Sequence, residues 1–157
     1  MKKLFRTNHN LKNLDLVILI ARVSIAALML SHGLPKLVSF LAEGPVQFPG
    51  ILGMSPELSL GLAVFAEVIC SLFILVGFGT RYATIPLIVT MLVAVLHVHV
   101  ADPFVKQEPA LHYLLVYGLL FLTGSGKYSV DHLLQQKKMT IGYSGVKVED
   151  PTVGIYN

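Results

Sequence analysis

A largely apolar run from Leu14 to Leu30 constrains the fold of this chain more than any other feature, because one arginine, Arg22, lies inside it. About 20 apolar residues span the hydrocarbon core of a bilayer, so such a run predicts a membrane-crossing helix. A fixed charge at the centre of a bilayer costs roughly 2.5 to 3.5 kcal/mol on insertion scales unless another group compensates it. We therefore expect a polar partner for Arg22 at the same depth on another helix.

The composition also indicates a membrane protein. Of the 157 residues, 54% are hydrophobic and only 13% are charged, which is too apolar for a soluble domain of this length. The formal charge of +3 does not indicate nucleic-acid binding, because the basic residues cluster near the chain ends and beside hydrophobic spans. The single cysteine, Cys70, excludes an internal disulfide and the paired thiols of a thiol-oxidising membrane enzyme.

Four apolar segments predict an all-α fold, namely a polytopic membrane protein with a four-transmembrane-helix bundle in residues 14–124. Pro35 should kink or end the first helix. The Ser55-Pro56-Glu57 sequence is typical of a helix start, with a capping hydroxyl followed by proline. A fourth helix opened by Pro109 would be only ~22 Å long, unless it begins before the proline. The expected helices cover residues 14–34, 56–76, 81–101 and 109–123.

The positions of lysine and arginine predict the orientation. Residues 1–13 form a basic N-terminus, and residues 125–138 carry three further lysines. Short segments rich in these residues stay in the cytoplasm, so we expect both termini there. Within 125–138 we expect a short surface helix with Leu133 and Leu134 against the membrane. Residues 139–157 lack a clear period and are predicted to form an irregular tail.

Glu67 is the predicted partner of Arg22. At 1.5 Å per residue, Arg22 lies ~12 Å and Glu67 ~15 Å from the expected cytoplasmic ends of their helices. Small residues one or two turns from Glu67 would let another helix approach it closely. The sequence therefore predicts a buried Arg22/Glu67 pair, and the alternative is that this pair only fixes helix register. The small residues are Ser59, Ala63 and Ser71.

Four histidines lie toward the same membrane face in this topology. Together with Lys36 and Asp102, they predict a polar pocket that opens to the outer face. Taken singly, each histidine is also explained as a hydrogen-bonding residue at the membrane interface. The four candidates are His32, His97, His99 and His112.

The third helix offers two histidines for one inward position. His97 and His99 lie about 200° apart on an α-helix, so both can face the centre only if the helix unwinds. Thr90 and Ala94 share the His97 side, which favours His97. Histidine or lysine can hydrogen-bond a quinone carbonyl, and two histidines from different helices could instead ligate haem b. No zinc spacing, phosphate loop or nucleophile elbow is found in the sequence, so no metal site is assigned.

The order and spacing of several short motifs resemble the DoxX family. They are Arg22 with Ser31-His32-Gly33-Leu34-Pro35-Lys36, Glu67 before Thr80-Arg81, a histidine ending the third helix, and Gly124-Ser125-Gly126-Lys127-Tyr128-Ser129-Val130-Asp131. The resemblance implies a small four-helix protein of the bacterial inner membrane. Some relatives are assigned as quinone-linked oxidoreductase subunits, including the membrane subunit of a thiosulfate:quinone oxidoreductase, and many have no known activity.

Two departures from the family pattern accompany the resemblance. Val68-Ile69-Cys70-Ser71 stands where the family is often glycine-rich, and Ser125 stands where proline is common. The first departure affects how closely the second helix can pack.

Our leading hypothesis is an accessory subunit of a membrane redox system with a quinone-type or other small lipophilic ligand. Arg22 and Glu67 would tune the buried site, while His32, Lys36 and one of His97 or His99 carry protons or ligand hydrogen bonds. A partner protein would supply electrons or enzymatic activity, and self-association stays open. The alternative is a non-catalytic scaffold or assembly factor for partner enzymes. A small-molecule carrier is disfavoured by the lack of a visible inverted repeat.

Overall fold

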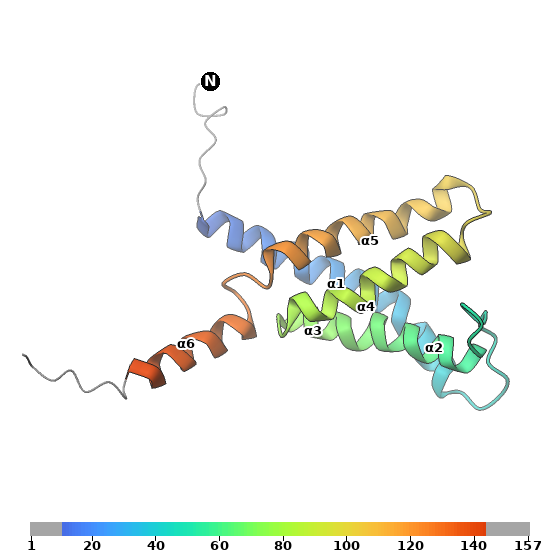
Figure 1. The fold of residues 1–157 in the computed structure, drawn as a ribbon, viewed down its shortest axis with the longest axis horizontal. Helices are drawn as coiled ribbons and strands as arrows, with labels where there is room; N and C mark the ends of the chain where they lie inside the picture. The colour runs from blue at the N-terminus through green and yellow to red at the C-terminus, as the bar shows by residue number, and fades with distance from the viewer. Residues whose placement is uncertain (1–10, 144–157) are drawn as a thin grey trace, which may run out of the picture.

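The computed structural model describes residues 11–143, so residues 1–10 of the predicted N-terminus and 144–157 of the predicted tail lie outside the described part. Every regular element within that part is helical (Figure 1). Two short π-helical segments, η1 and η2, continue the α-helices that precede them. The elements are α1 (Leu11–Leu41), α2 (Pro56–Val64), η1 (Phe65–Cys70), α3 (Ser71–Val76), α4 (Thr80–Val93), η2 (Ala94–Val98), α5 (Phe104–Thr123) and α6 (Val130–Tyr143).

Within residues 11–143, three continuous helical stretches are long and apolar enough to cross a membrane: Asn13–Leu41, Pro56–Val76 and Thr80–Val98. Bulky aliphatic and aromatic side chains cover their outward faces. The chain is therefore a multi-pass integral membrane protein in contact with the lipid bilayer. The α5 helix has 20 residues, but Lys106, Gln107 and Glu108 near its start reduce its apolar character.

Several helix boundaries differ from the predicted ones. The α1 helix continues through Pro35 to Leu41 instead of ending near residue 34. Proline removes one backbone N–H donor, a loss that membrane-spanning helices tolerate. The third stretch ends at Val98, α5 begins ahead of Pro109, and α6 lies within the predicted surface segment at its start but continues to Tyr143, so residues 139–143 are helical and not an irregular tail.

The helices pack as two pairs (Figure 1). The α1 helix lies against α2, η1 and α3, and α4 lies against α5. The pairs are joined by the 77–79 turn and contact each other through η1, α3 and α4. Toward the loops 42–55 and 99–103, at the right of the view, α2 and the α4–η2 stretch diverge. We call this the pocket end, and the opposite end, where α6 begins, the α6 end.

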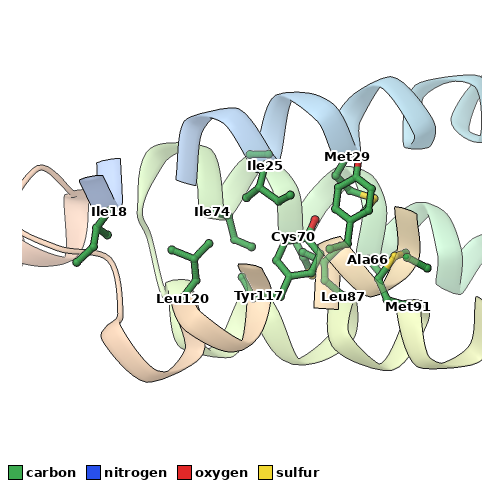
Figure 2. Close-up of a cluster of buried hydrophobic side chains, with 14 residues drawn as sticks. Ile18, Ile25, Met29, Ala66, Cys70, Ile74, Leu87, Met91, Tyr117 and Leu120 are labelled. Carbon is green, nitrogen blue, oxygen red and sulfur yellow. The ribbon is translucent and has the colours of Figure 1, made fainter. Parts of the chain in front are cut away.

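A closely packed apolar core fills the middle of the bundle (Figure 2). Ala26, Ile74, Leu87 and Tyr117 are fully buried there, and they come from α1, α3, α4 and α5. Each helix thus directs a stripe of side chains inward and exposes its bulky residues outward. This core separates the polar groups at the two ends of the bundle.

Candidate functional site

A pocket of about 600 Å³ lies at the pocket end, between the two helix pairs. Its walls are mainly apolar, and its polar groups are few. The lining residues that matter below come from α1 (Met29, His32, Lys36), the 42–55 loop (Phe48, Pro49, Leu52), α2 and η1 (Leu62, Ala63, Glu67), α4 and η2 (Val89, Thr90, Ala94), the 99–103 turn (His99) and α5 (Lys106, Tyr113).

An ion pair between Lys36 and Glu67 supplies the charge in this pocket. Lys36 Nζ donates to Glu67 Oε1 at 2.5 Å. The Glu67 side chain is only 2% exposed, whereas Lys36 is 33% exposed. Lys36 Nζ also lies 6.0 Å from the centre of the Phe48 ring, within cation–π range. The second Glu67 oxygen, Oε2, is buried and has no hydrogen-bond partner in the described part of the chain.

Gly33 lets α1 approach η1 closely enough to form this pair. A Cβ atom at Gly33 would lie 2.9 Å from Val68 Cγ2 and 3.0 Å from the Glu67 main-chain carbon. A side chain there would therefore force Val68 or the main chain at Glu67 to shift. Lys36 follows Gly33 by three residues, about one turn, and so lies on the same face of α1. The Gly33-Leu34-Pro35-Lys36 sequence thus positions the lysine over Glu67.

Arg22 does not pair with Glu67, and the predicted Arg22/Glu67 pair is therefore wrong. Arg22 is buried, as expected, with 2% of its surface exposed. Its guanidinium donates instead to two main-chain carbonyls, those of Ser125 at 2.8 Å and Tyr128 at 2.6 Å. Both acceptors lie in the turn between α5 and α6. Arg22 thus donates through both terminal nitrogens at the α6 end, away from the pocket, while its Nε has no hydrogen-bond partner among the described residues.

The error arose in the assumed depths. Gly77, directly after α3, lies against the Arg22 guanidinium, so these two residues share a level. Glu67 lies level with Gly33 instead, which places it about 16 Å from Arg22 along α1 at 1.5 Å per residue. The first helix extends beyond the end of α3. The two predicted depths were therefore counted from helix ends that do not lie at the same level.

Next to the turn that receives Arg22, hydrogen bonds of Asp131 join the start of α6 to the 77–79 turn before α4. Asp131 Oδ1 accepts from the Gly79 N–H at 2.8 Å, and its main-chain N–H donates to the Gly77 carbonyl at 3.0 Å. Ser129 Oγ caps the start of α6 by accepting from the His132 N–H at 3.2 Å. These bonds satisfy backbone groups that helix ends otherwise leave open. The region is a structural junction in which Arg22 is the central donor.

The π-helical segment η2 decides which histidine faces the pocket. The His99 N–H donates to the Ala94 carbonyl at 2.9 Å, a bond that spans five residues instead of four. This extra residue moves His99 onto the side of Thr90 and Ala94, and all three line the pocket. His97 is exposed and does not line it. The predicted preference for His97, which assumed a regular α-helix, is therefore wrong.

His99 belongs to a polar cluster at the mouth of the pocket. Its Nδ1 lies 2.8 Å from Asp102 Oδ2, and Lys106 Nζ donates to Asp102 Oδ1 at 3.2 Å. These hydrogen bonds, first that of His99 and then that of Lys106, hold the pKa of Asp102 below its usual range. Gln107 Nε2 donates to the His99 carbonyl at 2.8 Å and closes the turn between η2 and α5.

The remaining predicted histidines separate into one that lines the pocket and one that does not. His32 lines it and meets the ring of Tyr113 edge to face, with ring centres 6.0 Å apart. His112 is exposed, and its Nδ1 lies 2.8 Å from the Glu108 carbonyl oxygen on the same helix. Tyr113, which was not predicted from the sequence, is buried and stacks on Tyr117 at 5.9 Å. Their four-residue spacing on an apolar helix was an available signal.

In the part of the chain that the structure describes, no cluster of side chains supports metal ligation. Within residues 11–143, no three His, Cys, Asp or Glu side chains gather as metal ligands would. What the pocket offers is a lysine donor, a carboxylate acceptor and nearby aromatic rings within apolar walls. Such a set suits a small, mainly apolar ligand with polar oxygen atoms.

A sequence model of the DoxX family matches residues 17–100. That is more than half of the chain. The chain belongs to the DoxX family. The matched segment of this DoxX protein runs from α1 to two residues past the third stretch and includes His32, Lys36, Glu67 and His99. No curated protein and no solved structure matches the chain significantly.

Proposed function

We propose that this DoxX protein is a four-span protein of the bacterial inner membrane whose pocket binds a quinone-type or other small lipophilic ligand. It would serve there as an accessory subunit of a membrane redox system. One observation carries the proposal, namely the Lys36–Glu67 ion pair at an otherwise apolar pocket of about 600 Å³. The volume lies within the range of small-molecule sites, about 300 to 1,000 Å³.

The ion pair favours a ligand role because it is a poor stabilising device. Removing two charges from water costs several kcal/mol per ion, which mutual attraction repays only with good geometry and further hydrogen bonds. Here Glu67 Oε2 lacks such a bond within the described residues, so the pair is incompletely compensated. Intramembrane ionisable residues that face a cavity are functional candidates for this reason.

The residues present fit a quinone ring. Lys36 has three N–H donors and uses one on Glu67, so its ammonium retains donors for a carbonyl oxygen. Phe48, His32 and Tyr113 surround the same region and offer aromatic faces and edges to a flat ring. Two π-helical segments border the pocket, and such segments often occur at functional sites. A bound quinone would supply the redox chemistry, and a partner protein would supply the electrons.

The proposed topology adds α5 as the fourth span. The α5 helix lies along α4 over most of its length, and Tyr113, Tyr117 and Leu120 bury its inner face in the common core. A helix so placed shares the depth of its neighbours. With four spans, both termini lie on one side, and the positions of lysine and arginine favour the cytoplasm. The pocket then opens toward the outer face.

A scaffold without a ligand is the alternative function. The hydrogen-bonded junction around Arg22 favours it, since it fixes α6 to the bundle and leaves Leu133 and Leu134 exposed on that helix. A partner enzyme could be held there with the charges serving architecture alone.

The first experiment is mass spectrometry of lipophilic extracts together with a visible spectrum, on protein purified gently from its native membrane. A stoichiometric quinone supports the proposal, and a haem Soret band would replace the quinone with haem b. A colourless, quinone-free protein that brings down a soluble enzyme would favour the scaffold.

A paired substitution then separates ligand binding from folding. The double variant Lys36→Met/Glu67→Gln removes both charges and leaves no buried ion unpaired, so it should fold. It should bind quinone at least about tenfold more weakly, because a charge-assisted hydrogen bond is lost. Lys127→Met, an exposed lysine outside the pocket, is the matched control. Unchanged quinone affinity in the double variant would overturn the proposal.

A further inference from the structure

The pocket is open on one side between α2 and α4. Leu62 on α2 and Val89 on α4 both line the pocket, yet 49% and 54% of their surfaces are exposed. Both residues lie within stretches that cross the membrane. Side chains that line a pocket and also face outward at this depth mark an opening toward lipid rather than toward water.

The helix arrangement explains this opening. The α3 and α4 helices are tied together by the short 77–79 turn, and from there α2 and the α4–η2 stretch diverge toward the pocket end (Figure 1). The apolar core closes the bundle nearer the turn, where Ile74 and Leu87 are fully buried. The gap between the two helices therefore widens only at the level of the pocket.

The side of the pocket that faces the loops is more obstructed. Phe48 of the 42–55 loop lies over Lys36, and Leu52 and Pro49 of the same loop also line the pocket. The polar cluster of His99, Asp102 and Lys106 is hydrogen-bonded at the opposite rim. A ligand that came from water would have to pass these groups, whereas one from the bilayer would meet only apolar walls.

We propose that the ligand enters sideways from the bilayer, through the gap between Leu62 and Val89, and that it is an amphiphile with one long apolar chain. Its polar ring lies at Lys36 and Glu67, and its chain lies in the gap. The inference rests on the proposed function, since it names the class of ligand and its route into that same pocket. A chain in the gap stays in an apolar environment, so binding does not require its transfer through water.

The test uses a reporter tryptophan, because the chain contains none of its own. Phe48→Trp places one indole at the pocket, where a bound quinone quenches its fluorescence. In this background, Leu62→Phe/Val89→Phe narrows the gap. The matched control is Leu58→Phe/Ile85→Phe, one turn earlier on the same helices, where both residues are exposed and neither lines the pocket.

Quenching rates are measured in phosphatidylcholine nanodiscs with two benzoquinones that share one ring, one without a tail and one with a decyl chain. The gap variant should slow association of the tailed quinone by about tenfold or more, because entry then requires the helices to separate. The tailless quinone should change less than about twofold, and the control variant should behave like the parent.

Three results would overturn the inference. One is an unchanged rate for the tailed quinone in the gap variant, which indicates entry from water, and another is equal slowing of both quinones, which indicates general distortion of the pocket. The third is a co-purified phospholipid in the pocket that neither quinone displaces. If neither quinone quenches the parent protein at all, the proposed quinone site itself fails, which is a distinct outcome.

Discussion

Arg22 and Glu67 are equally buried charges in one helical bundle, and they have opposite surroundings. Arg22 donates to two carbonyls of its own chain, in a turn that closes around it. Glu67 accepts from Lys36, one third of which remains exposed toward a pocket. A charge enclosed by backbone groups holds a fold together, whereas a charge at an open pocket can act on something else. The residue type alone does not distinguish the two cases.

The difference suits the chemistry of the two side chains. A guanidinium presents several N–H donors in a fixed plane, so one arginine can bond two carbonyls of the same turn. Gly77 leaves room for it, since a Cβ atom there would overlap the guanidinium, and its φ of +74° also favours glycine. A lysine–carboxylate pair has fewer fixed directions and leaves ammonium donors for another molecule.

Arg22→Leu should have the largest effect on stability. It removes two part-buried hydrogen bonds from a charged donor, to the carbonyls of Ser125 and Tyr128, each worth about 1.5 to 3 kcal/mol. Thermal unfolding in detergent measures the loss. The control is Arg81→Leu, an exposed arginine that donates to one carbonyl, that of Leu122 at 3.1 Å, and should lose about 1 kcal/mol or less. Equal losses for the two variants would contradict a special role for the Arg22 junction.

Glu67→Gln should have the next largest effect and should lower both the stability of the protein and its affinity for quinone. It removes the carboxylate partner of Lys36, so we expect a loss of about 1 to 3 kcal/mol. The exposed Glu43→Gln variant is the control and should melt like the parent. Identical melting temperatures for Glu67→Gln and Glu43→Gln would refute the buried pair. Quinone affinity, measured in parallel, should fall only for Glu67→Gln.

The general architecture was accessible from sequence, because hydropathy reports directly on which segments can lie in lipid. All-helical character, membrane insertion and the family followed from apolar runs and a few spaced motifs. That Arg22 and Glu67 need partners also followed, since an uncompensated charge in lipid is costly. Their identities did not, because pairing depends on how far each helix extends past its neighbours. Pro35, expected near the end of α1, lies well inside it.

The π-helical segments illustrate a second limit. Helical periodicity assumes a constant rotation per residue, and η2 breaks that rule by one residue. His99 thereby takes the inward-facing position that His97 would have in a regular α-helix. No local sequence signal predicts this change, because the Ala94–Val98 sequence is typical of a regular apolar α-helix. The sequence predicted only that both histidines could face the centre if the helix unwound, whereas η2 brings His99 to the pocket and leaves His97 exposed.

Replacing His99 and His97 in turn tests which of them faces the pocket. The expected effect on ligand binding is smaller than that of Glu67→Gln. His99→Phe should weaken quinone binding by roughly threefold to tenfold, since it alters the pocket wall and removes a hydrogen-bonding group worth about 1 kcal/mol. His97→Phe, on the exposed side of the same segment, should leave the affinity unchanged. Fluorescence quenching by a tailed quinone, in the Phe48→Trp background, provides the measurement. A larger effect at His97 would indicate that the third helix is regular in the membrane.

The smallest expected effect concerns the rim of the pocket and its response to acid. Hydrogen bonds from His99 and Lys106 hold the pKa of Asp102 below its ordinary value of 3.8 in the folded protein. A carboxylate with a lowered folded pKa contributes stability that is fully present above the ordinary value and is lost as pH falls through the folded value. The melting temperature of the parent should therefore fall below about pH 4 by slightly more than that of Asp102→Asn. Because Asp102 lies outside the helices and is partly exposed, the difference should be small compared with the losses at Arg22 and Glu67. A steep acid transition that disappears in Asp102→Asn would instead make the rim as important to stability as the buried charges, and would reverse the ranking of the two ends of the bundle.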